Sequence, residues 1–203
     1  PLERGEFVKA ATELKEAEKA AFRLGPGAAG ATEALQAARE ANLLANLATS
    51  RLDVIAREAR TAAESNKLDE WASQVRVLYE GKAYLFDGVI VPRDSTDGTP
   101  YQFEFVLFEG DYRFEVDVAS LDLFPRLDLA EPQRLVFGAS LVAVEPSAID
   151  ARRWMFRLHS QSGVLMSRSE PLRQLGWTVD EDLVSVLQRQ QVWAEGLARE
   201  DLQ

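Results

Sequence analysis

The chain has 203 residues, of which 46% are hydrophobic and 28% are charged, a balance typical of a globular protein with one or two domains. Its 33 acidic residues outnumber its 23 basic residues, and the formal net charge of -10 argues against a surface that attracts nucleic acid or anionic lipid. The lack of cysteine excludes disulfides and thiolate metal sites, and the single histidine, His159, excludes multi-histidine metal sites.

Neither a membrane anchor nor a secretory signal is predicted. No apolar run approaches the ~20 residues that span a bilayer, and the first residues, PLERGEFVKAATELKE, lack an apolar core. We therefore expect a cytoplasmic location and no membrane partner. The missing initiator methionine leaves open a targeting segment that has been removed.

The N-terminal part, residues 1–67, is predicted to form an antiparallel helical hairpin. Apolar or small residues recur every three or four positions from Glu3 to Leu24, which indicates a first helix. RLGPGAAGAT, residues 23–32, interrupts this pattern with glycines and a proline. A second helix then runs from Thr32 toward Ser65 with alanines along one face, and at 1.5 Å per residue it would be ~50 Å long. The sequence thus predicts a hairpin with unequal arms.

Residues 68–168 are predicted to form a central antiparallel β module. VLYEG at 77–81 and VLFEG at 106–110 each predict the turn of a hairpin, in which glycine supplies a positive backbone angle; a duplicated hairpin unit is the alternative origin of the repeat. Further strands are predicted over 134–144, 152–159 and 164–167. About seven strands are enough for a small barrel or a curled sheet.

Residues 169–203 return to a helical pattern. A short turn is expected from Ser169 to Gly176, and Thr178 with Glu181 predicts a capping box that starts a C-terminal helix. An apolar stripe along this helix would pack on the sheet or on the N-terminal hairpin. The predicted fold class is therefore α+β: an N-terminal helical hairpin, a central antiparallel β module and a C-terminal helix.

No assembled catalytic, cofactor or metal site is predicted. Asp94 and Asp97 offer oxygen ligands, but their loop lacks the spacing of a calcium site, so we interpret it as an ordinary turn. His159 has no nucleophile elbow near it and is interpreted as a strand-end residue. GPGAAG at 25–30 follows a helix and not a strand, which is the wrong context for a phosphate loop. We therefore expect a protein that is not an enzyme and uses no cofactor.

Two segments are candidates for binding a partner. The stretch around Arg153 and Arg157 is basic and aromatic, and three interpretations stay open: a solvated strand face, a contact for an acidic protein, or a contact for nucleic acid. SLDLFPRLDLAEPQ at 120–133 is a connector too rich in leucine to be simply solvated. The candidate partner-binding residues are Arg153, Arg157, Leu121, Leu123, Phe124 and Leu127.

VFGASLVAVE at 136–145, followed by SEPLRQLG at 169–176, resembles the C-terminal domain of the bacterial transcript-cleavage factors that bind RNA polymerase. The resemblance covers under a quarter of the chain. Those factors pair a helical hairpin with a small β domain, and they hold a catalytic metal with acidic residues at the hairpin tip. The tip here, LGPGAAGAT, has no carboxylate, so the resemblance implies a contact with a polymerase and no cleavage chemistry.

The leading functional hypothesis is a non-enzymatic adaptor or assembly subunit that binds another protein, or a second copy of itself, through its helical arms. An alternative is a β module that encloses a small ligand among inward-facing aromatic residues. Those residues would be Tyr84, Phe86, Phe103, Phe105, Tyr112, Phe114 and Trp154. A third hypothesis is a regulator that binds a nucleic-acid machine such as RNA polymerase through protein contacts.

Overall fold

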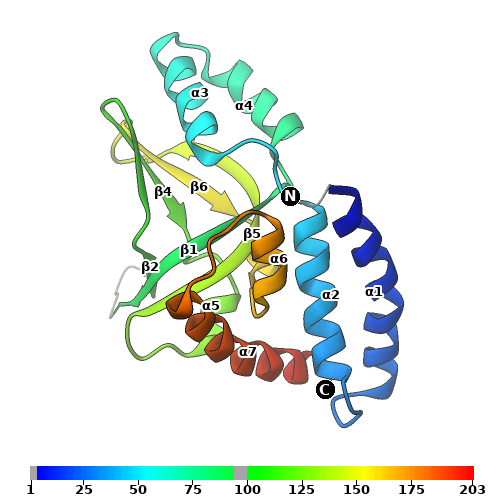
Figure 1. Cartoon of the computed structure of the whole chain (residues 1–203). Coiled ribbons are helices and arrows are strands. Elements are labelled where there is room, and N and C mark those ends of the chain that lie inside the picture. Colours follow the sequence, from blue (N-terminus) through cyan, green and yellow to red (C-terminus); the bar gives the residue numbers. More distant parts are fainter. Residues whose placement is uncertain (1–3, 94–99) are drawn as a thin grey trace. The chain divides into compact units, whose positions relative to one another are not determined.

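The computed structural model describes residues 4–93 and 100–203, and it confirms the α+β class with helices at both ends of the chain (Figure 1). The helices are α1 Arg4–Leu24, α2 Ala31–Ala45, α3 Leu52–Glu64, α4 Leu68–Leu78, α5 Leu123–Leu127, α6 Ser169–Gln174 and α7 Glu181–Asp201. The strands are β1 Ala83–Pro92, β2 Tyr101–Phe103, β3 Val106–Glu109, β4 Tyr112–Asp117, β5 Gln133–Pro146, β6 Arg153–Leu158 and β7 Val164–Leu165.

The strands form one curled sheet in the order β2-β1-β5-β6-β4-β3, and β7 pairs with β5. The predicted curled sheet of about seven strands is thereby confirmed. One pair departs from the predicted antiparallel set, because β4 and β6 run parallel, with Phe114 opposite Trp154 and Val116 opposite Phe156. The chain between them contains α5 and the long strand β5, which provides the crossover that a parallel pair requires.

Two compact units share the strand β5. Unit 1 comprises the described chain up to Asn46, together with Leu135–Gly138 and Val164–Gln203. Unit 2 comprises Leu47–Arg134 and Ala139–Gly163. The division into a helical hairpin at 1–67, a β module at 68–168 and a C-terminal helical segment at 169–203 stays a prediction.

Unit 1 is built on the helical hairpin of α1 and α2, which confirms the first arm and its turn. The buried face of α1 carries Phe7, Ala11 and Ala21. Small side chains allow close approach of the helices, and Ala21 joins Leu35 and Ala198 in a core cluster where α7 packs as well. The predicted docking of the C-terminal helix on the hairpin is therefore confirmed within this unit.

The single long helix predicted from Thr32 toward Ser65 is wrong, because α2 ends at Ala45 and α3 begins at Leu52. Between them the chain joins the sheet: the Ala48 amide donates to the Ala83 carbonyl at 2.9 Å. This segment contains neither proline nor glycine, and its one local helix-stop signal is the weaker one of Asn46, the C-cap of α2. The break is imposed by pairing with a distant part of the chain.

The repeated VL-aromatic-EG sequence takes two different structures. VLFEG at 106–110 is the predicted hairpin, formed by β3 and the start of β4, whereas the hairpin predicted at VLYEG is wrong because Val77 and Leu78 end the helix α4. Trp71 and Val75, one helical turn apart, are the buried face of α4. What the two copies share is a left-handed glycine, with φ of 75° at Gly81 and 60° at Gly110.

The core of unit 2 is aromatic. Phe114, Trp154 and Phe156 are fully buried, and the Phe114 ring lies 5.8 Å from each of the other two ring centroids. Trp71 of α4 makes an edge contact with Trp154 at 5.7 Å. Helix α4 is therefore anchored to the sheet by one tryptophan pair, worth about 1 kcal/mol beyond its buried area.

The C-terminal helix begins two residues later than the capping box predicts. Asp180 is the N-cap of α7, and its side chain accepts a hydrogen bond from the Leu183 amide at 2.8 Å. The predicted cap at Thr178 is wrong, because aspartate at the position before Glu181 satisfies the first turn. The short turn predicted from Ser169 to Gly176 is the helix α6, which ends at Gln174.

None of the helices within the described residues combines the length and the apolar character needed to cross a membrane.

Candidate functional site

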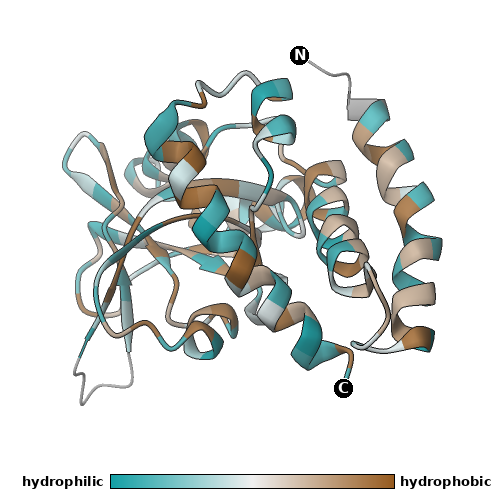
Figure 2. Cartoon of the chain, turned by 60° about the horizontal axis from the view of Figure 1, so that its bottom comes forward, coloured by the Kyte–Doolittle hydropathy of each residue, from teal (hydrophilic) through white to brown (hydrophobic). Residues whose placement is uncertain are grey.

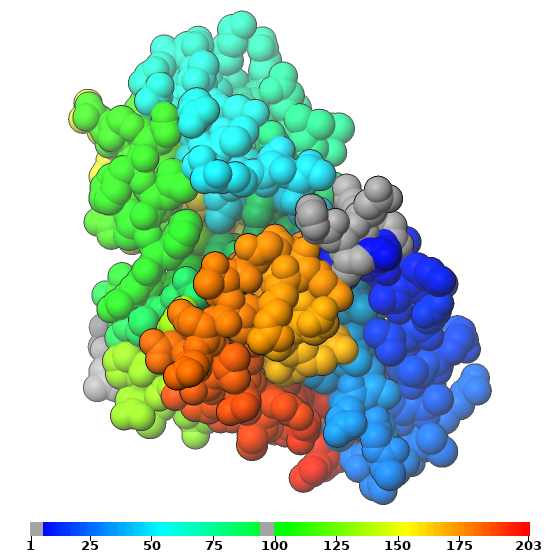
Figure 3. Space-filling view, in the orientation of Figure 1, coloured from blue at the N-terminus to red at the C-terminus, as the bar shows by residue number. Residues whose placement is uncertain are grey.

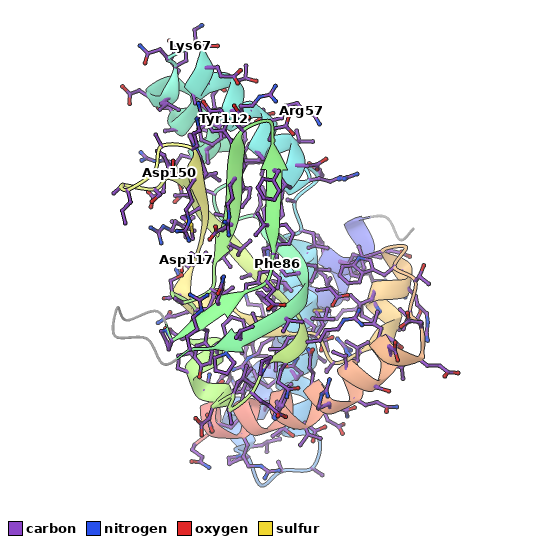
Figure 4. All side chains as sticks on the ribbon, turned by 90° about the vertical axis from the view of Figure 1, so that its left-hand side faces the viewer. Arg57, Lys67, Phe86, Tyr112, Asp117 and Asp150 are labelled. Atoms are coloured by element: carbon purple, nitrogen blue, oxygen red, sulfur yellow. The ribbon has the colours of Figure 1, made fainter. Side chains whose placement is uncertain are left out.

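Arg153 and Arg157 lie on the face of the sheet in unit 2 that points away from its core. Successive side chains of a strand point to opposite faces of the sheet, so the residues between the buried ones form this second face. We call it the outer sheet face. It carries Val106 and Phe108 of β3, Arg113, Glu115 and Asp117 of β4, Arg153, Met155 and Arg157 of β6, and Glu145 of β5. Figure 4 views these strands, with Tyr112 at the start of β4, Asp117 at its end and Asp150 in the loop before β6.

The arginines of the outer sheet face are paired with carboxylates of the same face. Arg153 Nη2 donates to Glu115 Oε2 at 2.7 Å. Arg113 Nε lies 2.6 Å from Glu115 Oε1, an ion pair without the alignment of a hydrogen bond. Because Glu115 is only 8% exposed, it is held between two guanidinium groups with little access to water. Its charge is compensated locally.

Arg157 makes a second cluster of the same kind. Its Nε donates to Glu145 Oε1 at 2.8 Å, and its Nη1 donates to Asp117. The hydrogen bond that Arg157 donates to Glu145 raises the pKa of Arg157, which is protonated at any physiological pH in either case. When Arg113 and Arg153 are counted with Arg157, the outer sheet face holds three arginines and three carboxylates. This balance favours the interpretation as a solvated strand face over a net basic patch.

Two exposed apolar side chains border these charges. Phe108 is 69% exposed and Val106 is 40% exposed, both on β3, which ends the strand order. Sequence reasoning did not single them out, because VLF is apolar at three successive positions and so gives no alternation that tells the outer face from the inner one.

The candidate partner-binding residues that lie in the 120–133 connector are mostly buried. Leu121, Leu123 and Phe124 are buried, and Leu127 is partly buried. They stabilise unit 2: Phe124 packs against Tyr101 with ring centroids 6.0 Å apart. The expectation that this segment is not simply solvated is confirmed, and its role in binding a partner stays a prediction.

The helix α1 exposes a regular line of side chains beside its buried face. These residues are Val8, Thr12, Lys15, Lys19 and Phe22, and we call them the outer seam of α1. Their spacings of four, three, four and three place them on one side of the helix. Val8 is 48% exposed and Phe22 is 50% exposed, while Leu24 at the end of the helix is 69% exposed. Figure 2 shows apolar and polar residues interspersed along α1.

His159 is exposed at the end of β6, as predicted. Ser162 Oγ donates to the main-chain carbonyl of His159 and not to its ring, and the Asp150 side chain accepts from the Arg152 amide. The candidate groups are therefore not assembled into a triad. Among the described residues, no group of three or more His, Asp or Glu side chains is placed to hold a metal ion.

GPGAAG forms the turn between α1 and α2, as the sequence predicts. Gly25 and Gly30 lie in the left-handed region. Asp94 and Asp97 lie outside the residues that the structure describes.

The aromatic residues proposed to line a ligand site contact one another in unit 2. Phe103 and Phe105 stack with centroids 5.6 Å apart, and Phe86 makes edge contacts with both. Tyr84 is buried, and its hydroxyl has no hydrogen-bond partner among the described residues. These rings pack on one another, and the enclosed-ligand hypothesis stays a prediction.

Comparison with known proteins gave no match: no protein-family model, no curated sequence and no solved structure is similar enough to this chain to assign it to a family.

Proposed function

We propose that this protein is a non-enzymatic interaction module, an adaptor or assembly subunit, that binds another protein through the outer seam of α1. The observation that carries the proposal is the pair Val8 and Phe22, two apolar side chains each about half exposed and lying on one side of a long helix. Exposed apolar surface on a regular helical line is what a partner helix covers.

The charges of the outer seam of α1 favour a particular partner. Lys15 and Lys19 lie between Val8 and Phe22, and both are exposed. Lys19 Nζ also donates to Glu16 Oε1 of the same helix at 2.7 Å, an exposed pair that contributes little and that a partner's carboxylate can replace. In a parallel two-fold pairing of this seam with a second copy, or in an antiparallel pairing centred on its middle residue, Lys15 would face Lys15 of the other copy. Like charges placed opposite each other across an interface are unfavourable. The partner is therefore a different protein that presents carboxylates between two apolar positions.

The proposal includes a cytoplasmic location. It also includes RNA polymerase as one alternative for the partner. Direct binding of nucleic acid has less support, because the arginines of the outer sheet face are neutralised by their own carboxylates.

The test is affinity capture from a cell lysate with quantitative mass spectrometry, using the wild type and the double variant Val8→Ser/Phe22→Ser. A protein bound through the seam should be recovered with the wild type and reduced about tenfold or more with the double variant. Val192→Ser is the matched control, because Val192 is an apolar residue of α7 that is 70% exposed. Equal recovery with the seam variant and the wild type would contradict the proposal.

A further inference from the structure

Unit 1 contains a pocket of about 570 Å³ between α2, α7 and the segment that joins β7 to α6. Its volume is in the range of small-molecule sites, ~300–1,000 Å³. Figure 3 shows the face on which α2, in blue, adjoins the yellow-orange segment around residue 168 and the orange-to-red α7. The polar side chains that line it are Glu33, Gln36, Ser167, Arg168, Gln191 and Glu195.

The wall of the pocket is fixed by a buried carboxylate. Glu40 is fully buried, and its Oε1 accepts from the Ser167 amide at 2.9 Å, from Ser167 Oγ at 2.5 Å and from Gln36 Nε2 at 3.0 Å. Its Oε2 accepts from Arg168 Nε at 2.9 Å. Arg168 is the one cationic residue among the described residues that line the pocket, and its charge is neutralised by Glu40. It repels a cationic ligand only weakly.

Gln36 offers the pocket an unpartnered acceptor. The residue is 7% exposed, and its Nε2 donates both to Glu40 and to the Leu165 carbonyl, at 2.7 Å. Two acceptors around the nitrogen fix the orientation of the carboxamide, so the other end is the oxygen. This Oε1 accepts no hydrogen bond from any described residue. Because Gln36 lines the pocket, this oxygen is available to a donor of a bound ligand.

The two other acids of the pocket carry uncompensated charge. Neither Glu33 nor Glu195 forms an ion pair with a described residue, and Glu195 accepts only the Gln191 amide at 3.0 Å. With Glu40 and Arg168, the group holds three carboxylates against one guanidinium. The pocket therefore combines net negative charge with a directed acceptor.

We propose that this pocket binds a small aliphatic cation with two or more ammonium groups, a ligand of the diamine or polyamine class. One ammonium would lie between Glu33 and Glu195, and an N–H donor would reach Gln36 Oε1. The small side chains of Ala34 and Ala37 leave room for the methylene chain. This site lies apart from the outer seam of α1, so either proposal can fail without the other.

The test is calorimetric titration with spermidine and with cadaverine at low ionic strength, on the wild type and on Glu33→Gln/Glu195→Gln. We expect the double variant to bind about tenfold more weakly or worse, since each exposed ion pair contributes up to about fivefold. Glu13→Gln/Glu16→Gln is the matched control, because it removes the same charge from exposed positions of α1. The control should bind as the wild type does.

A second readout follows the carboxamide itself. The side-chain amide resonances of Gln36 should shift on addition of spermidine, while those of the exposed Gln188 should not. Failure of both amines to bind would overturn the proposal. Equal weakening in both double variants would also overturn it, because the attraction would then be that of an acidic chain and not of this pocket.

Discussion

Gln190 bonds to both main-chain groups of Val136: its Oε1 accepts from the Val136 amide at 2.7 Å, and its Nε2 donates to the Val136 carbonyl at 2.7 Å. The same Nε2 donates to the Met166 carbonyl at 2.8 Å. The Gln190 side chain of α7 thus forms hydrogen bonds of the kind that a neighbouring strand would form. It satisfies main-chain groups of β5 and of the residue after β7, all within unit 1. Gln190 itself is fully buried.

Replacing Gln190 with leucine should therefore be strongly destabilising. The change keeps the volume but leaves two buried main-chain groups, the Val136 amide and the Met166 carbonyl, without partners, at ~1–3 kcal/mol each. The Val136 carbonyl loses one of its two bonds and still accepts from the Met166 amide at 2.9 Å. We expect a loss of about 3 kcal/mol or more in the free energy of unfolding, measured by urea denaturation. Gln188→Leu, at an exposed position of the same helix, should change it by less than about 0.5 kcal/mol. Similar losses for the two variants would contradict this role.

Two single variants test whether Asp180 or Thr178 is the N-cap of α7. Asp180→Ala should lower the free energy of unfolding by about 1 kcal/mol, because it removes the acceptor for the Leu183 amide. Thr178→Ala should have little effect, since the structure assigns it no capping bond. Thermal or urea unfolding of both variants checks the assignment, and a larger loss for Thr178→Ala would restore the capping box.

The glycines of the repeated motif should be intolerant of alanine. Gly81→Ala and Gly110→Ala each place a side chain at positive φ and should cost about 1–2 kcal/mol. At Gly110 the added Cβ would also lie 3.3 Å from Arg60 Nη1. Gly196→Ala is the control: it lies inside α7 with nothing within 4 Å of the added atom, and should stabilise by about 0.5–1 kcal/mol. Equal effects at all three glycines would refute the argument.

Two buried tyrosines should respond differently to the loss of their hydroxyls. Tyr79 donates to Glu58 Oε2 at 2.9 Å, whereas the Tyr84 hydroxyl has no hydrogen-bond partner among the described residues. Tyr84→Phe should be neutral or stabilising by up to about 1 kcal/mol, and Tyr79→Phe should destabilise by about 1 kcal/mol. Chemical denaturation at neutral pH would measure both, and the opposite order would contradict the geometry.

The same tyrosines predict a loss of stability at alkaline pH. Burial raises the pKa of both phenols, so the folded state favours the protonated form. Their contribution is fully present below the unfolded pKa of ~10 and is lost as the pH rises through that value toward the folded pKa. Tyr84→Phe should reduce the alkaline loss, as measured by melting temperature against pH. An unchanged profile would show that Tyr84 does not titrate in this way.

Charge reversal in the outer seam of α1 tests the partner's chemistry. Lys15→Glu/Lys19→Glu should weaken binding to an acidic partner by about tenfold or more and should reverse its dependence on ionic strength, because salt would then screen a repulsion. The measurement is a titration of the captured partner at two salt concentrations. Undiminished affinity at low salt would remove the lysines from the interface.

The sequence predicts those parts of the fold that rest on local patterns. The helix α1, the turn at Gly25 and Gly30 and the strands β5 and β6 follow from periodicity and from turn chemistry. The break between α2 and α3 does not, because it depends on the bond between Ala48 and Ala83. In the same way the helical structure of Val77 and Leu78 depends on Trp71 packing against Trp154, a contact that no local pattern reveals.

The candidate sites, like the fold, could be predicted only where they depend on local patterns. Alternation correctly places Arg153 and Arg157 outward, but their neutralisation requires the parallel register of β4 and β6, which brings Glu115 and Asp117 beside them. At the pocket of unit 1, Gln36 bonds to Leu165 and Glu40 bonds to Ser167, each across more than a hundred residues. A glutamine and a glutamate four positions apart on a helix are ordinary in sequence. Only the folded chain shows that both are buried.

The most direct test of the proposed interaction is the molar mass of the protein in solution, measured by size exclusion with light scattering, alone and with its captured partner. The account predicts a monomer alone at low ionic strength and a stoichiometric complex with the partner. The complex should be lost in Val8→Ser/Phe22→Ser and kept in Val192→Ser. A dimer of the chain alone that the seam variant dissociates, or a complex that the seam variant leaves intact, would contradict it.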